Sequence, residues 1–155
     1  MDLDVLGSLL PSYARTIEYK RISGHRSQVF KKHNCLVLRI PSNFSPIGHF
    51  VVLLRTQKSI EYFSSLGGSP EKELKQLGQD KAPLMALLGQ NYIYNSKALQ
   101  SKNSNIHSCA LHCLARIKLR DLKLADYQKM FNREIRLTTG DDIVAMLTIL
   151  LVSDL

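Results

Sequence analysis

The stretch His49-Phe50-Val51-Val52-Leu53-Leu54-Arg55 decides the fold of this chain. Its apolar residues follow one another without alternation, so it predicts a central strand that is buried on both faces. Residues 41–48 before it are rich in proline, serine and asparagine, which is typical of a loop. After a turn, residues 60–64 predict a second strand that forms a hairpin with the first. The run Cys35-Leu36-Val37-Leu38-Arg39-Ile40 predicts a further strand, so the chain is built around a sheet.

Helices are predicted around these strands. The apolar residues 3–10 predict a short helix, whereas the polar and basic residues 12–34 predict loops. Ser69 and Pro70 mark the start of another helix, with acidic residues in its first turn. Because the strands cluster before most of the helices, we predict an α+β fold. The remaining predicted elements are a short strand at residues 91–94 and helices at about residues 108–119, 127–131 and 141–152.

Length and composition fit one domain, residues 1–155, with a substantial core. No apolar run reaches the ~18 residues that a membrane span needs, and the N-terminus lacks the basic segment of a secretory signal. Hydrophobic residues make up 45% of the chain, which argues against disorder. The three cysteines, Cys35, Cys109 and Cys113, are too few for a disulfide framework. We therefore expect free thiols in a reducing, intracellular compartment.

The formal net charge of +8 is concentrated in two clusters of basic residues. Such clusters can bind a phosphate backbone, or they can simply be solvated surface that keeps the protein soluble. The sequence leaves both interpretations open. The first cluster is Arg15, Lys20, Arg21, Arg26, Lys31 and Lys32, and the second is Arg116, Lys118, Arg120 and Lys123.

Three residues have the chemistry and the setting of a nucleophilic site. Cys109 follows a polar loop at the predicted start of a helix, where backbone N–H groups lower the pKa of a thiol and can hold an oxyanion. His49 opens the buried strand behind a flexible loop, a position suited to a general base. Gln100 lies in the loop before Cys109, and its side-chain amide can donate to the oxyanion. Each residue alone is usually unreactive, so the combination carries the prediction.

Four motifs follow one another along the chain. They are Gly48-His49-Phe50, Tyr62-Phe63-Ser64, Gln100 with Asn103-Ser104, and Ser108-Cys109-Ala110-Leu111-His112-Cys113. Their order, which is His, the third member of a catalytic triad, Gln and Cys, resembles that of the adenovirus protease family, whose relatives include proteases of polinton-like DNA viruses. It is more distantly similar to that of the SUMO-deconjugating proteases. The resemblance covers most of the chain.

The resemblance implies the papain-like, adenain-type α+β fold, in which a small central mixed sheet is flanked by helices and the nucleophile begins a helix. It implies a cysteine endopeptidase that cleaves viral precursor proteins during virion maturation. In that reaction Cys109 is the nucleophile, His49 is the base and Gln100 is the oxyanion donor.

The chain departs from the family pattern at two positions that matter for catalysis. Ser64 stands where the family has the acidic third member, and Ala110 stands where it has a glycine. A serine can orient an imidazole but cannot neutralise an imidazolium. Glu61 is three residues before Ser64, so strand alternation points it to the opposite face and makes it a poor substitute. Activity should therefore be low unless another acid fills in, and we expect Ser64→Asp to raise the rate of cleavage, or at least of thiol labelling.

The resemblance also implies partners and a location. It implies a protein substrate, a monomer, no required cofactor, no membrane partner and an enzyme in the virion and the host nucleus. Because DNA is a cofactor of the adenovirus enzyme, the two basic clusters suggest that DNA could stimulate this chain.

Three other interpretations remain open. A zinc site could be built from His107, Cys109, His112 and Cys113, although a second separated ligand pair is missing. A catalytically weakened relative could serve as a basic module that binds DNA or virion proteins. A deubiquitinase or SUMO protease would use the same residues.

Overall fold

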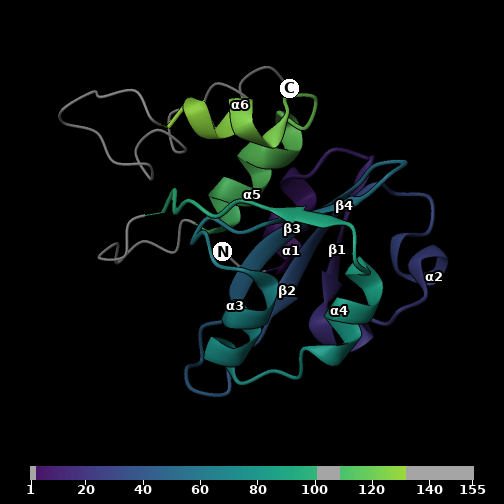
Figure 1. Ribbon diagram of the computed structural model, residues 1–155, viewed down its shortest axis with the longest axis vertical. Helices are drawn as coiled ribbons and strands as arrows, with labels where there is room; N and C mark the ends of the chain where they lie inside the picture. Colours follow the sequence, from purple (N-terminus) through teal and green to yellow (C-terminus); the bar gives the residue numbers. More distant parts are fainter. Residues whose placement is uncertain (1–2, 101–108, 132–155) are drawn as a thin grey trace.

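The computed structural model describes residues 3–100 and 109–131 and has an α+β fold (Figure 1). Its centre is a five-stranded mixed sheet in the order β1-β2-β3-β4-β5. The inner pairs β2·β3 and β3·β4 are antiparallel, whereas β1 and β5 each add to an edge in parallel. The predicted mixed sheet flanked by helices is therefore confirmed. The strands are β1 (Ala14–Glu18), β2 (Cys35–Ile40), β3 (His49–Arg55), β4 (Ile60–Phe63) and β5 (Tyr92–Tyr94).

The central strand β3 is buried along almost its whole length. Val51, Val52 and Leu53 are fully inaccessible to solvent, because helices cover both faces of the sheet. The bounds of β2 and β3 are those predicted, and the antiparallel pairing of β3 with β4 confirms the hairpin. A continuous apolar run therefore located the middle of the sheet.

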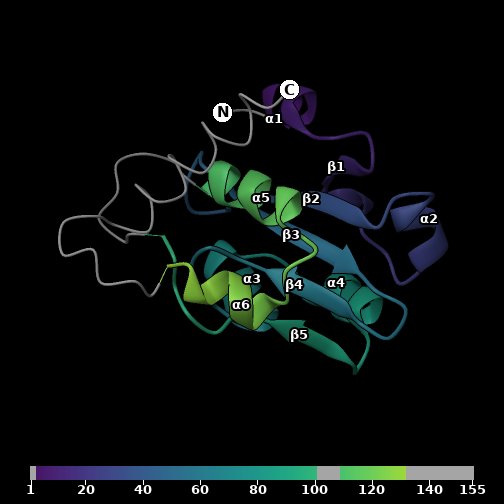
Figure 2. The same cartoon turned by 90° about the horizontal axis from the view of Figure 1, so that it is seen from above.

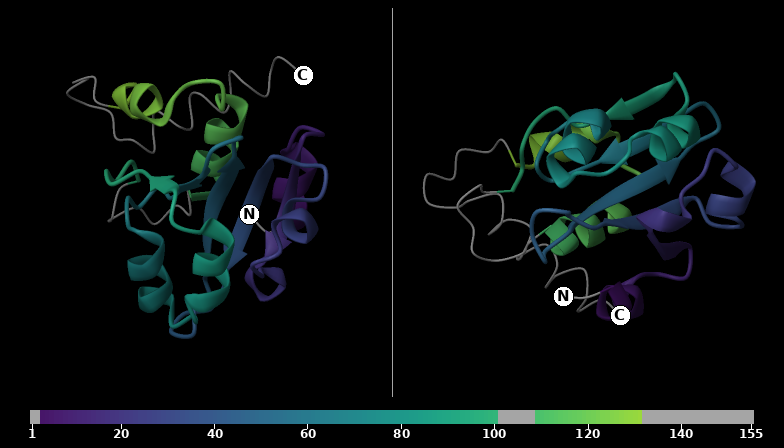
Figure 3. Two further views of the ribbon diagram at one scale, coloured as in Figure 1. Left: turned by 45° about the vertical axis from the view of Figure 1, so that its right-hand side comes forward. Right: turned by 90° about the horizontal axis from the view of Figure 1, so that it is seen from below.

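Helices lie on the two faces of the sheet, as the views in Figures 2 and 3 agree. On one face α3 and α4 pack against a cluster that includes Leu53 and Tyr62. On the other face α1 and α5 pack against a cluster that includes Val52 and Phe63. Neighbouring residues of a strand thus contact different helices, as the two-residue period requires. The helices are α1 (Leu3–Leu9), α2 (Arg26–Phe30), α3 (Pro70–Leu77), α4 (Ala82–Leu88), α5 (Cys109–Lys118) and α6 (Leu124–Lys129), with a 3₁₀ helix at Tyr19–Arg21.

The start of α3 has the predicted chemistry. Ser69 has an extended backbone, and its side-chain oxygen accepts a hydrogen bond from the Lys72 N–H at 3.3 Å. Pro70 opens the helix, and Gly78 ends it in the left-handed conformation at φ 72°. These caps fix where the first turn of α3 meets the sheet, and that turn carries Glu73.

The prediction of loops for residues 12–34 is wrong in part. The segment contains β1, α2 and the 3₁₀ helix at Tyr19–Arg21. In β1 only Ile17 is buried, and the strand owes its pairing to the ladder with β2 rather than to an apolar run of its own. The pattern of apolar residues in β1 therefore gave little indication of a strand. The helix predicted at residues 141–152, the Asn103-Ser104 pair and His107 lie outside the described residues.

Candidate active site

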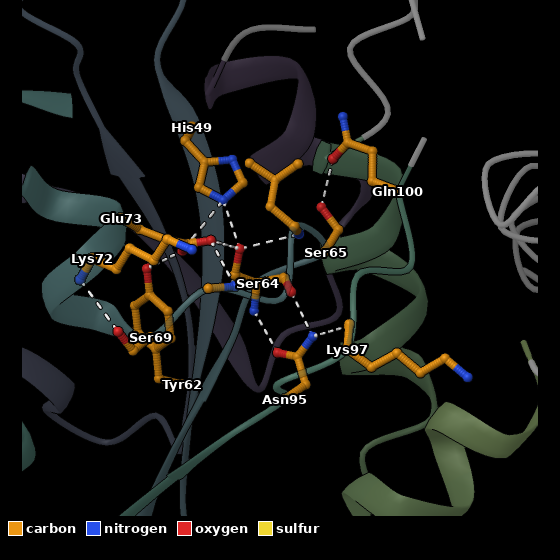
Figure 4. Close-up of polar contacts among 12 residues, drawn as sticks. His49, Tyr62, Ser64, Ser65, Ser69, Lys72, Glu73, Asn95, Lys97 and Gln100 are labelled. Carbon is orange, nitrogen blue, oxygen red and sulfur yellow. Dashed lines mark hydrogen bonds and ion pairs between the residues drawn. The ribbon is translucent and has the colours of Figure 1, made fainter. Parts of the chain in front are cut away.

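His49 lies at the first position of β3, opposite Ile40 of β2. Gly48 precedes it where a side chain would not fit, since a Cβ atom would lie 2.5 Å from the Ile40 carbonyl oxygen. The His49 ring is buried, with 6% of the residue exposed. Its Nε2 atom lies 2.8 Å from the Ser64 Oγ atom (Figure 4). The predicted partnership of His49 and Ser64 is therefore present in the structure.

Ser64 is held in place through its backbone by Asn95, a residue that the sequence interpretation missed. The Ser64 N–H donates to Asn95 Oδ1 at 2.9 Å, and the Asn95 side-chain amide donates to the Ser64 carbonyl at 2.6 Å. Both residues are fully buried. The chain then turns at Gly67, whose φ of 74° favours glycine and whose N–H donates to the Ser64 carbonyl at 3.0 Å. Asn95 thereby fixes the position of the Ser64 hydroxyl.

Glu73, in the first turn of α3, supplies a carboxylate to this group, and the sequence interpretation missed it as well. The Ser64 hydroxyl donates to Glu73 Oε2 at 2.5 Å, and the Tyr62 hydroxyl donates to Oε1 at 2.5 Å. A third donor, the Gly68 N–H, lies 3.3 Å from Oε2. His49 Nε2 is 3.7 Å from Oε1, and Glu73 is 3% exposed. The only sequence signal was the capped helix start, which places an acid at this turn for reasons of helix stability alone.

The hydrogen bonds assign the proton positions on His49. An ionised Glu73 only accepts, so the single Ser64 hydroxyl hydrogen is directed to Glu73. Ser64 Oγ must then accept from His49 Nε2–H, as it also does from the Leu66 N–H at 3.3 Å. The hydrogen on Nε2 leaves Nδ1 as the basic nitrogen of the neutral ring. In Figure 4 the Nε2 edge of the ring faces Ser64 and Glu73, and Nδ1 lies on another side of the ring.

Burial controls the charge of all three titratable groups. It lowers the pKa of His49 to about 4, and it raises the pKa of the Cys109 thiol. It also raises the pKa of Glu73, although the hydrogen bonds from Ser64 and Tyr62 oppose that rise. At neutral pH the resting site therefore contains a neutral imidazole and a thiol. In this state His49 and Cys109 do not form a permanent thiolate–imidazolium ion pair.

Cys109 is the first residue of α5, as predicted, and is 7% exposed. It packs in the same cluster as Phe50, the residue after His49. The backbone N–H groups of Phe50, Ala110 and Cys109 itself stabilise the thiolate and lower its pKa, but burial outweighs them. Within the described residues no hydrogen bond joins the Cys109 sulfur to the His49 ring. Both residues lie at the end of the sheet where β3 begins, and their direct contact stays a prediction.

Gln100 is tethered beside Ser64 through the neighbouring residue. Its side-chain carbonyl accepts a hydrogen bond from the Ser65 hydroxyl at 2.6 Å, and its backbone N–H donates to the Ser65 carbonyl at 2.9 Å. The amide nitrogen points away from Ser65 in Figure 4. Because the carbonyl end is held, the N–H₂ end is oriented as a donor. Its role as a donor to an oxyanion beside Cys109 stays a prediction.

The expectations for Glu61 and Arg116 had different outcomes. Glu61 does face away from the His49 group, because both of its oxygens accept from the Arg116 guanidinium at 2.9 Å. Arg116 had been assigned to a basic surface cluster, which is wrong, since this side chain is 1% exposed. Across the described residues no three His, Cys, Asp or Glu side chains gather as a metal site requires. None of the helices in this part of the chain is long and apolar enough to cross a membrane.

Comparisons with known proteins give a viral relative and a weak structural likeness. No protein-family model matches the chain. The chain is 29% identical over 116 residues to the uncharacterized protein V9 of Sputnik virophage, a match that covers 66% of this chain and 66% of that protein. It is also similar to the solved central domain of the uncharacterized Lpg1148 protein from Legionella pneumophila, at 12% identity and a TM-score of 0.46 over 99% of this chain and 97% of that domain. The virophage relative agrees, at the coarse level of a viral protein, with the viral origin that the sequence implied.

Proposed function

We propose that this chain is a cysteine endopeptidase of the adenovirus-protease type. The observation that carries the proposal is the convergence of chain segments at one end of the sheet. There His49 is held by Ser64 at 2.8 Å, and the N-terminus of α5 places Cys109 against the next residue, Phe50. The tethered Gln100 adds an amide donor beside Ser64.

The chemistry of this site would proceed through a thioester. The proton of the Cys109 thiol passes to Nδ1 of His49, and the sulfur forms a bond to the carbonyl carbon of the scissile peptide. The displaced electron pair resides on the carbonyl oxygen, where the N–H groups at the start of α5 and the Gln100 amide donate to it. The C–N bond then breaks, and the amine leaves with the proton from Nδ1. Water then attacks the thioester carbon and gives a proton to Nδ1 of His49. The C–S bond breaks, the carboxylic acid product leaves, and the proton returns from Nδ1 to the Cys109 sulfur.

The substrate class and the location are proposed from the family resemblance, and the virophage relative agrees with a viral origin alone. The proposed substrates are precursor proteins that are cleaved during virion maturation, in the virion and the host nucleus. The proposed enzyme acts as a monomer and needs no bound cofactor. Lys20, Arg21, Lys31 and Lys32 are exposed, so DNA could bind this part of the first basic cluster and stimulate the enzyme.

Labelling with an electrophilic thiol probe tests the nucleophile. Cys109→Ala should abolish both labelling and peptide cleavage, because the reacting sulfur is gone. Cys113→Ala is the matched control one helical turn away, and it should leave labelling in place because the Cys113 side chain is buried and only packs. Unchanged labelling of the Cys109→Ala variant by peptide mapping would assign the reactivity to another residue.

A second candidate function is a catalytically weakened relative that binds DNA or virion proteins. Burial favours it, because a raised pKa at Cys109 keeps the thiol protonated. The exposed lysines of the first basic cluster give it a surface for phosphate. DNA affinity that falls steeply with salt, in a protein whose cysteines label no faster than a free thiol, would favour this function over the protease.

A further inference from the structure

We propose that Glu73 is the acidic positioning residue of this site and acts on His49 through the Ser64 hydroxyl. The inference rests on the proposed function, and it deepens that function by relocating the missing acid from the end of β4 to the first turn of α3. Ser64 then serves as the bridge between the acid and the base.

The geometry of the three side chains carries this assignment. The Ser64 oxygen is 2.8 Å from His49 Nε2 and 2.5 Å from Glu73 Oε2, so it belongs to both hydrogen bonds at once. The other Glu73 oxygen is 3.7 Å from the same ring nitrogen. A positive charge that forms on His49 during proton transfer would therefore lie beside a buried carboxylate, where screening by water is weak. A serine alone could not supply that negative charge.

In the part of the chain that the structure describes, no lysine or arginine side chain forms an ion pair with Glu73. Its hydrogen-bond donors are the Ser64 and Tyr62 hydroxyls and the Gly68 N–H. Lys72 precedes Glu73 in α3, but its side chain is exposed. Its charge lowers the pKa of Glu73 less than the hydrogen bonds from Ser64, Tyr62 and Gly68 do. Among the described residues, His49 is the one base within 4.0 Å of the Glu73 oxygens. The buried carboxylate therefore gains its strongest partner only when His49 becomes protonated.

This arrangement reverses the expectation for Ser64→Asp. An aspartate at position 64 would place a second carboxylate against Glu73, where the serine oxygen is now 2.5 Å away. Two carboxylates at that distance share a proton rather than both ionising. We now expect the single substitution Ser64→Asp to leave the rate unchanged or lower it. Adding Glu73→Gln to it should restore activity, because the carboxylate then stands alone at the position of the family's acid.

The test combines the labelling rate of Cys109 by iodoacetamide with the ¹⁵N NMR signals of the His49 ring. The variants are Glu73→Gln, Ser64→Asp with Glu73→Gln, and Glu71→Gln as a matched control. Glu71 is in the same helix turn but pairs with the exposed Lys81, so its substitution makes the same change of charge away from His49. Glutathione gives the rate of an ordinary thiol.

We expect wild-type His49 to carry its hydrogen on Nε2 at pH 7. Glu73→Gln should lower the labelling rate about tenfold or more and shift the tautomer, because Ser64 is then free to donate to the ring. Glu71→Gln should change neither, and the double variant should recover part of the rate. A wild-type ring with its hydrogen on Nδ1 would overturn the proposal without any variant, as would a folded Glu73→Gln protein with the wild-type rate and tautomer. If the tautomer responds to Glu73→Gln while Cys109 labels no faster than glutathione, the role of Glu73 stands and the proposed protease activity fails.

Discussion

Glu61 and Glu73 are two buried carboxylates near the same strand, yet their surroundings differ completely. Glu61 lies within β4 and both of its oxygens are paired with Arg116, whose remaining hydrogen bonds go to the Leu119 and Leu122 carbonyls at 3.0 Å. Glu73 lies on the opposite face and accepts from neutral groups, with an imidazole 3.7 Å away. Among the described residues, Glu61 has a permanent cationic partner, whereas Glu73 gains one only when His49 is charged.

This contrast separates a structural acid from one that can respond to chemistry. The Glu61–Arg116 pair ties β4 to α5 and to the segment after α5, and it borders a hollow at the Arg55 end of β3. The Glu73 group lies at the His49 end of the same strand. A buried carboxylate that lacks a permanent cation costs free energy, and sites that carry out proton transfer are where such a cost is retained.

The largest effect on stability should come from Arg116→Met. Removing the guanidinium leaves Glu61 buried and unpaired, which should lower the free energy of unfolding by about 3 to 5 kcal/mol. Urea denaturation measures this loss. The double variant with Glu61→Leu should recover most of it, since no buried charge remains. The labelling rate of Cys109 in the folded fraction should stay at the wild-type value. A loss of unfolding free energy below about 1 kcal/mol would mean that water reaches Glu61. The contrast between a permanently paired Glu61 and an unpaired, buried Glu73 would then fail.

The next effect is a dependence of stability on pH that originates in the His49 region. Burial lowers the pKa of His49 to about 4 in the folded protein, so between pH 6.5 and 4 the unfolded chain binds a proton that the folded chain does not. The contribution of His49 to the free energy of unfolding is therefore complete above pH 6.5 and falls as the pH falls, by about 3 to 4 kcal/mol at most. The raised pKa of Glu73 acts in the opposite direction near the acidic end, because the folded chain then binds the proton more readily. Unfolding curves at several pH values should show the loss, and His49→Gln should flatten it. A wild-type curve that stays flat from pH 6.5 to 5 would contradict the buried, neutral His49.

Sequence patterns predicted the elements of this fold better than its site. The bounds of β2 and β3 follow from continuous apolar runs, and Ser69 and Pro70 locate the start of α3 because capping is local chemistry. The contact between His49 and Ser64 was expected from the family resemblance, which assigns Ser64 to the third position of the triad. Glu73 could not be found in the same way. Acids in the first turn of a helix are common and usually exposed, and its role depends on how α3 packs against the sheet.

A smaller effect is expected from Tyr62→Phe, which removes one of the three donors to Glu73 and leaves the aromatic packing intact. The loss of a buried hydrogen bond to a carboxylate should cost about 2 kcal/mol of unfolding free energy. The pKa of Glu73 should rise further, because that hydrogen bond now lowers it. Cys109 labelling should slow at mildly acidic pH, where more Glu73 becomes protonated, and less so at pH 8. An equal slowing at both pH values would mean that the Tyr62 hydroxyl acts by holding the Glu73 side chain in position rather than by lowering its pKa.

The smallest effect should come from Glu71→Gln, which provides a third carboxylate for the comparison. Glu71 and Lys81 form an ion pair at 3.0 Å, but their side chains are 50% and 60% exposed. Water and salt screen such a pair, and its contribution to the free energy of unfolding is about 0 to 1 kcal/mol. Glu71 also lies in the first turn of α3, where a negative charge favours the helix by a few tenths of a kcal/mol. Urea denaturation at low salt should show a loss within that range, and raising the salt concentration should shrink it. Glu73 is two residues further along the same helix. If Glu71→Gln lowers the free energy of unfolding by more than about 2 kcal/mol, then Glu71→Gln and Glu73→Gln both act by destabilising the first turn of α3. The effect of Glu73→Gln could then not be assigned to a carboxylate beside His49.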